Sequence, residues 1–178
     1  MATLRELKGR IGSVASSEKI TGAMKMISSA KMHKAEQSLK RLLPFRTQIE
    51  SIIGNLLTSD AECSSPLLEV RDVHKVGIVV FGSDDGLCGA YNVNIFKQLL
   101  ARINDLRAEL GLDLAVAIYP VGGKMTKAVR KITGDGISVE TMFGVDSKTT
   151  GDGVREFTDM LQGKFLKGEL DRIDLLYM

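Results

Sequence analysis

The chain has 178 residues, of which 44% are apolar and 26% are charged, and its formal net charge is +2. This composition is typical of a folded protein that holds one α/β domain of ordinary size. The longest apolar run, Val76 to Gly82, is far below the ~20 residues that a membrane-spanning helix needs, so no membrane span is expected. The N-terminus has neither a hydrophobic signal core nor an arginine-rich presequence, which predicts a cytosolic chain.

The first predicted element is a long amphipathic helix over residues 1–58, with a kink near Pro44. A coiled-coil stripe with 3-4 spacing is formed by Leu4, Leu7, Ile11 and Val14 and resumes at Met32, Ala35, Leu39 and Leu42. Between these two sets, the apolar face rotates around the helix to Ile20, Met24 and Ile27. We therefore expect this middle part of the helix to contact a different partner. The first 43 residues alone would extend ~65 Å, whereas a globule of this chain length is ~40 Å across. We therefore expect this helix to protrude and to need a partner.

Charge is divided unevenly along the chain. Residues 1–46 contain ten Lys or Arg against three Asp or Glu, which gives +7, and the remainder carries −5. A basic helix of this kind predicts an anionic partner, either nucleic acid or an acidic protein surface. Because no aromatic residue precedes Phe45, stacking on bases is not available, and the acidic protein is favoured over nucleic acid.

A linker at residues 59–74 leads to a segment, residues 75–178, with alternating strand and helix patterns. Strands are predicted at 76–81, 114–119, 137–143 and 173–177, and helices at 93–110, 125–134 and 154–165. Helices between apolar strands predict an α/β fold with a doubly wound, largely parallel sheet. The expected architecture is thus a long N-terminal coiled-coil helix plus this sheet domain.

The loop after the first strand, GSDDGLCGAYN, stands where a ligand site is expected in such a fold. It does not have the features of a nucleotide loop, because Asp84 and Asp85 would repel phosphate. The segment Gly122-Gly123-Lys124 also differs from a phosphate-binding loop, which needs Ser or Thr directly after the lysine. No Cys or His pair has the spacing of a zinc site. We therefore expect no cofactor, no metal and no ATP hydrolysis by the chain itself.

Cys88 is the one candidate nucleophile, since a thiol near a helix N-terminus can have a lowered pKa. The only histidines are His33, on the long helix, and His74, at the amino end of the first strand. An alternative hypothesis is therefore a small α/β enzyme that uses Cys88 and has a helical dimerisation arm. Against it, Cys88 is interpreted as a small buried side chain fitted between Gly86 and Gly89.

Two motifs resemble one known family. The stretch RIGSVASSEKITGAMKMISSAKMHKAE, residues 10–36, resembles the N-terminal helix of the γ subunit of F-type ATP synthases, with its Lys-Ile-Thr-x-Ala-Met-x-Met hallmark. The stretch VGIVVFGSDDGLCGAYNVNIF, residues 76–96, is similar to that family's Ser-Asp-Arg-Gly-Leu-Cys-Gly-Gly-Phe-Asn. The resemblance covers the whole chain, although residues 120–170 match only in pattern.

The resemblance implies a rotating central stalk that couples proton flow through the membrane ring to conformational change in the catalytic β subunits. It implies no bond chemistry in this chain, and the partners would be the α and β subunits, the ε subunit and the membrane ring of c subunits. The location would be peripheral, on the cytoplasmic face of a bacterial plasma membrane. Contacts with α and β are expected from Ile20, Met24, Lys25, Ile27 and Lys31, and a loop near β from Asp84, Asp85, Gly86, Leu87 and Cys88.

The chain departs from the family at two important points. The family has Arg where Asp85 stands, which puts that residue's ionic contact with an acidic loop on β in doubt. The chain also stops at Met178, in what looks like a strand, before the family's long C-terminal helix. We expect it to be a fragment whose uncovered first helix self-associates.

Overall fold

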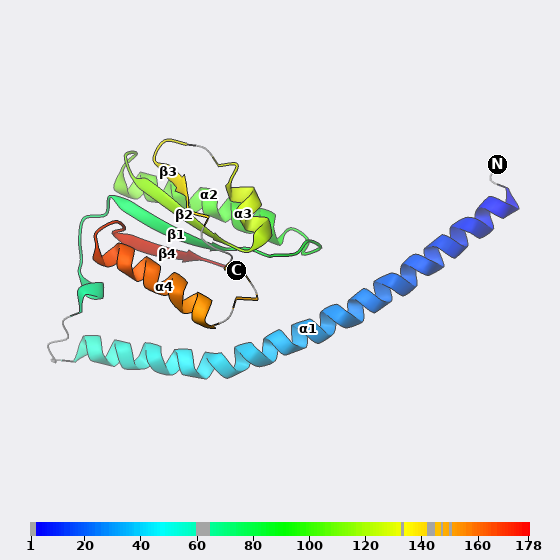
Figure 1. The fold of residues 1–178 in the computed structure, drawn as a ribbon, viewed down its shortest axis with the longest axis horizontal. Coiled ribbons are helices and arrows are strands. Elements are labelled where there is room, and N and C mark those ends of the chain that lie inside the picture. The colour runs from blue at the N-terminus through cyan, green and yellow to red at the C-terminus, as the bar shows by residue number, and fades with distance from the viewer. Residues whose placement is uncertain (1–2, 60–64, 133, 142–144, 147, 150) are drawn as a thin grey trace. The chain divides into compact units, whose positions relative to one another are not determined.

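A computed structural model describes residues 3–59, 65–132, 134–141, 145–146, 148–149 and 151–178. The chain divides into two compact units, Met1–Cys63 and Ser64–Met178. The first unit is a single helix and the second is an α/β domain (Figure 1). The predicted fold class, a long N-terminal helix plus a parallel α/β sheet, is confirmed. Among the described residues, no helix has both the length and the apolar character needed to cross a membrane.

The helix of the first unit, α1, spans Leu4–Thr58 and has 55 residues. It begins with a capping box: the Thr3 hydroxyl accepts a hydrogen bond from the Glu6 backbone N–H, and the Glu6 carboxylate accepts one from the Thr3 N–H. The helix runs through Pro44 as one gently curved element. Since Pro44 has no N–H, the carbonyl of Lys40 cannot form its usual bond there, yet the flanking turns maintain the helix. At ~1.5 Å per residue, α1 is about 80 Å long.

The sheet of the second unit has four described strands in the order β3-β2-β1-β4, and every pairing is parallel. The strands are β1 (Lys75–Phe81), β2 (Ala115–Val121), β3 (Ile137–Val139) and β4 (Arg172–Leu176). The helices are α2 (Tyr91–Leu110), α3 (Gly123–Val129) and α4 (Gly151–Leu166), and a 3-10 turn, η1, covers Pro66–Leu68. Parallel strands need crossover connections, and the helices between successive strands supply them.

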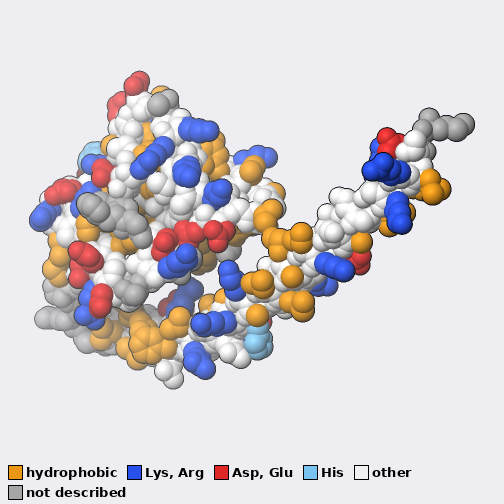
Figure 2. All heavy atoms as spheres, turned by 45° about the vertical axis from the view of Figure 1, so that its right-hand side comes forward, with side chains coloured by type: hydrophobic (Ala, Val, Ile, Leu, Met, Phe, Trp, Pro, Cys, Tyr) orange, Lys and Arg blue, Asp and Glu red, His pale blue; other side chains and the backbone are white. Residues whose placement is uncertain are grey.

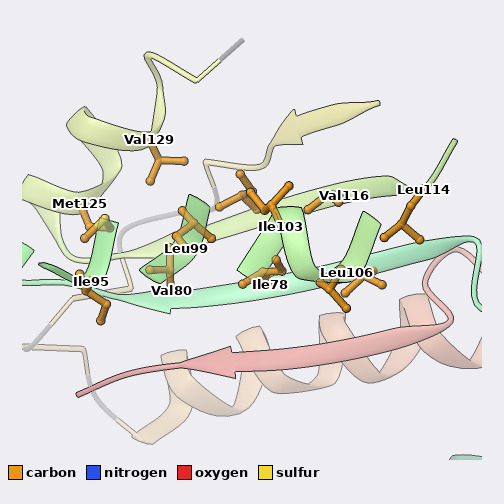
Figure 3. Close-up of a cluster of buried hydrophobic side chains, with 12 residues drawn as sticks. Ile78, Val80, Ile95, Leu99, Ile103, Leu106, Leu114, Val116, Met125 and Val129 are labelled. Atoms are coloured by element: carbon orange, nitrogen blue, oxygen red, sulfur yellow. The ribbon is translucent and has the colours of Figure 1, made fainter. Parts of the chain in front are cut away.

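Alternate residues of the central strands build two separate cores. Ile78 and Val80 of β1 point to the same side as Val116 of β2, where α2 and α3 cover the sheet (Figure 3). The other face presents Val79 together with Tyr119, and α4 covers it through residues such as Leu161. Helices on both faces make the sheet doubly wound, as predicted.

The observed elements differ from the predicted ones mainly at their ends. The short helix predicted to stop at Gly134 ends at Val129, because the N–H groups of Lys131 and Ile132 bond to carbonyls three residues back instead of four. The strand predicted over 137–143 is described as a strand only at Ile137–Val139, and residues 142–144 lie outside the described part. By contrast, α2 ends at Leu110 as predicted, with Gly111 at φ +106° as its cap.

Candidate functional site

Two regions hold the residues singled out by the sequence: the stripe of α1 and the loop after β1. Within its own unit α1 has no buried residue, so its apolar side chains are exposed, as Figure 2 illustrates along the helix. The coiled-coil stripe consists of Leu4, Leu7, Ile11, Val14, Met32, Ala35, Leu39 and Leu42, all of them exposed. A helix with an exposed apolar stripe of this length is built to be covered by another element.

The predicted contact residues on α1 do not all share one face. Ile20 is 62% exposed and Ile27 is 59% exposed. Helical spacing places Lys31 seven residues, or about two turns, after Met24, and so nearly in line with it. Lys25 follows Met24 directly and therefore lies about 100° around the helix. The geometry thus groups Ile20, Met24, Ile27 and Lys31 in one stripe and places Lys25 beside it.

The loop after β1 is tied to the turn after β2 by backbone and side-chain hydrogen bonds. The Gly82 N–H donates to the Val121 carbonyl at 2.9 Å, and the Lys124 N–H donates to the Ser83 carbonyl at 3.0 Å. In addition, Asp84 Oδ1 accepts a hydrogen bond from the Gly123 N–H at 2.9 Å. The base of the loop is therefore fixed by the second strand as well as by its own.

Asn92, at the start of α2, organises the inside of the loop. Its Oδ1 accepts from the Ser83 N–H at 3.0 Å, and its Nδ2 donates to Ser83 Oγ at 2.7 Å and to Cys88 Sγ at 3.2 Å. The Ser83 hydroxyl also donates to the Asp85 carbonyl at 2.7 Å. One amide side chain thus links the loop to the following helix. This role could not be predicted from the sequence, because a single Asn has no diagnostic spacing.

The tip of the loop is exposed. Leu87 is 92% exposed and has φ +63°, a backbone conformation unusual for a residue other than glycine. Asp85, Gly86 and Cys88 are exposed as well. The interpretation of Cys88 as a small buried side chain is therefore wrong: the residue is exposed, although its sulfur contacts Ser83 and Asn92.

The hydrogen bond between Ser83 Oγ and Cys88 Sγ, which lie 3.5 Å apart, lowers the pKa of the Cys88 thiol below its ordinary value, and slight desolvation opposes this effect. Nucleophilic catalysis by Cys88 would further require a base, and the only histidines are His74 and His33. His74 precedes β1, whereas Cys88 follows it. Seven strand residues separate them by about 20 Å. His33 lies on α1. The geometry does not support the alternative of an enzyme that uses Cys88.

Within the described ranges, no group of three His, Cys, Asp or Glu side chains could hold a metal ion. The loop after β1 presents backbone, acidic, apolar and thiol groups, and the stripe of α1 presents apolar groups beside basic ones. Such surfaces are suited to contact with other protein chains.

Known proteins of similar sequence indicate the family of this chain. A family model described as ATP synthase matches residues 3–178. The ATP synthase gamma chain of Bacteroides thetaiotaomicron is 39% identical over 177 residues, which is 99% of this chain and 58% of that protein. The gamma chain of Phocaeicola vulgatus is 38% identical over 178 residues, 99% of this chain and 60% of that protein. The chain spans about three fifths of the length of these relatives. It belongs to the ATP synthase gamma chain family.

Proposed function

We propose that this chain acts in the central stalk of an F-type ATP synthase, as the helix and α/β domain of its γ subunit. The observation that carries the proposal is the 55-residue helix with its uncovered apolar stripe, in a chain that aligns from end to end with gamma chains. A single helix about 80 Å long transmits torque over a distance that no compact domain of this size could span.

In this role α1 lies along the axis of the catalytic ring formed by the α and β subunits. The rotated stripe at Ile20, Met24 and Ile27 contacts the ring, and Lys31, in line with Met24, pairs with acidic groups on β. Lys25, at the side of the stripe, contacts the ring at another angle of rotation. The excess of positive charge on α1 supports an acidic surface as its surroundings.

The α/β domain is the foot of the stalk in this proposal. It contacts the ε subunit and the membrane ring of c subunits, and the loop Asp84–Cys88 lies near β. Asp85 replaces the Arg of the family, so this loop contacts β through groups other than that arginine. The protein is peripheral to the membrane, on the cytoplasmic face in a bacterium.

The chain supplies no bond chemistry in this role. Nucleotide hydrolysis and synthesis belong to the catalytic subunits, and rotation of α1 changes the conformation of each β subunit in turn. The fixed base of the loop after β1 suits this function, because a stalk must transmit force without local deformation.

The test is a chimera of the Bacteroides thetaiotaomicron gamma chain in which residues 1–178 of this chain replace the matching segment. Expressed with the host's other subunits, the chimera is expected to co-purify with α and β in the host's own stoichiometry. A control chimera carries Ile20→Asp, Met24→Asp and Ile27→Asp, which place charges on the contact stripe and should reduce co-purification. Failure of the unmodified chimera to co-purify, while the host gamma chain does so, would contradict the proposal.

A further inference from the structure

A cluster of basic side chains on α3 and in the turn that follows it, here called the basic face of α3, has no role in the function proposed above. Residues 122–132 contain Lys124, Lys127, Arg130 and Lys131 and no acidic residue. The opposite side of this helix is apolar and fully buried, because Met125 and Val129 are 0% exposed. The four basic residues are all exposed. The helix therefore turns a uniformly basic face to the surroundings.

These cations are not neutralised by neighbours. Elsewhere in the α/β domain, Arg71, Arg102, Lys164 and Arg172 each form an ion pair with Asp or Glu. Among the described residues, the four basic groups of the α3 segment form no ion pair within 4.0 Å. Four neighbouring unpaired cations repel one another, and an anionic partner would relieve that repulsion.

A pocket of about 420 Å³ lies directly beside this face. Thr126, Lys127 and Arg130 line one side of it, and Pro120, Thr141 and Val145 contribute to the rest. Asp146, also in the lining, accepts hydrogen bonds from the Lys148 N–H at 2.9 Å and from the Thr149 hydroxyl at 3.1 Å. Its carboxylate is thus engaged within its own turn. Asp84 lines the pocket as well, and its Oδ1 accepts a hydrogen bond from the Gly123 N–H at 2.9 Å. The pocket thus places Lys127 and Arg130 beside two hydrogen-bonded carboxylates and a partly apolar wall, and the excess of positive charge comes from the adjoining basic face.

We propose that the basic face of α3 and this pocket form a docking surface for an acidic segment of a partner protein, with Lys127 and Arg130 pairing with its carboxylates. Charge complementarity identifies the partner as acidic. A concave pocket of about 420 Å³ favours a peptide segment over a lipid bilayer, since a flat bilayer surface cannot fill it. This inference does not depend on the stalk function, because it concerns a face of the α/β domain and not the stripe of α1.

The test uses the full chain and a defined probe, a peptide of six glutamates with a photoreactive benzoylphenylalanine at one end. After irradiation at low salt, mass spectrometry locates the cross-links on the chain. This local readout separates binding at α3 from binding at the basic helix α1. We expect cross-links within residues 120–146, and we expect them to fall at least fivefold in the double variant Lys127→Glu/Arg130→Glu.

A matched control reverses two exposed cations elsewhere in the same domain, Lys97→Glu/Arg155→Glu, with the same change in net charge. Its cross-links at 120–146 should stay within twofold of those of the unmodified chain. The conservative variant Lys127→Arg/Arg130→Lys should retain binding, which shows that the loss follows charge and not misfolding. Equal losses in the control and in the α3 variant, or no cross-links at 120–146, would overturn the proposal. The proposal would also be overturned if the chain did not bind the peptide but bound vesicles of phosphatidylglycerol and phosphatidylcholine through Lys127 and Arg130.

Discussion

The backbone of Gly122 lies against the carbonyl of Gly82, so closely that a Cβ on Gly122 would be only 2.8 Å from the Gly82 oxygen. Gly122 also has φ +97°, which side chains rarely tolerate. These two glycines follow β2 and β1 respectively, and their contact allows the two loops to meet at the carboxyl edge of the sheet. The positions of the loops after β1 and β2 therefore depend on each other through this one contact.

Gly122→Ala is expected to destabilise the α/β domain by about 2–4 kcal/mol, because it adds both backbone strain and a steric clash. Urea unfolding followed by tyrosine fluorescence, to which the buried Tyr119 contributes, measures the change. The control is Gly163→Ala in α4, where a Cβ would meet nothing within 4 Å. That substitution should stabilise the helix by up to ~1 kcal/mol. A Gly122→Ala variant as stable as the unmodified chain would show that the two loops separate at little cost.

A second stability prediction concerns the anchor between α2 and β4. Arg102 Nε and Nη2 both donate to Asp174 Oδ2, at 3.0 and 2.8 Å, and Arg172 Nε donates to Asp174 Oδ1 at 2.7 Å. The hydrogen bonds to Asp174 raise the pKa of Arg102. Asp174→Ala leaves two guanidinium groups without their acceptor and should cost about 1–3 kcal/mol in unfolding free energy. The exposed Asp159→Ala, on α4, serves as the control and should change stability by less than ~0.5 kcal/mol.

Alkylation of Cys88 tests the geometry of the loop tip. Because the Ser83 hydrogen bond lowers the thiol pKa, thiolate forms at a lower pH than in an ordinary cysteine, whose reference value is 9.0. The rate of reaction with iodoacetamide, followed on the Cys88 peptide by mass spectrometry, should therefore reach half its maximum at a lower pH than the rate for an unstructured cysteine peptide. Ser83→Ala removes the hydrogen bond and should move this midpoint to higher pH. An unchanged midpoint would mean that Ser83 does not stabilise the thiolate.

The 178-residue chain is expected to self-associate through α1. Burial of apolar surface is worth about 25 cal/mol per Å², and the stripe could bury several hundred Å² against a second copy. The positive charge of α1 opposes this association, so added salt should strengthen it. Analytical ultracentrifugation measures the effect, and Leu7→Gln/Ile11→Gln/Val14→Gln should weaken it. A monomer at high concentration, with residues 3–40 slow in hydrogen exchange, would indicate instead that the helix is covered within its own chain.

How far the sequence alone could predict these features depends on the range of the interactions. Helix and strand positions followed from apolar periodicity, which is a local signal, and Gly111 ended α2 as its conformational freedom suggests. The sequence could not identify Arg102 as the partner of Asp174, because 72 residues separate them. It likewise missed the contact of Gly122 with Gly82, since such an approach depends on the final pairing of the strands. The exposure of Cys88 could not be predicted either, because flanking glycines are as compatible with an exposed loop tip as with a buried turn.

The lysines of α1 offer a test within the assembled complex. In the chimera with the Bacteroides thetaiotaomicron gamma chain, Lys25→Glu/Lys31→Glu would place negative charges opposite an acidic surface on β. Since each exposed ion pair is worth at most about 1 kcal/mol, the complex should still assemble. ATP-driven proton pumping should fall, because like charges would then face each other. Lys8→Glu/Lys40→Glu makes the same charge change elsewhere on the helix and should pump at close to the level of the unmodified chimera. Unchanged pumping in the Lys25/Lys31 variant would show that these lysines do not face β.

Rotation of the chain itself is the most direct measurement of the central claim. In the chimera, with Cys63→Ser and Cys88→Ser, a bead is attached through Lys97→Cys on the α/β domain, and the α and β subunits are fixed to a surface. On addition of ATP, the bead is predicted to rotate continuously in one direction and to stop when ATP is removed. An assembled complex that hydrolyses ATP while the bead shows only random fluctuation would contradict the proposal that this chain is part of the rotating stalk.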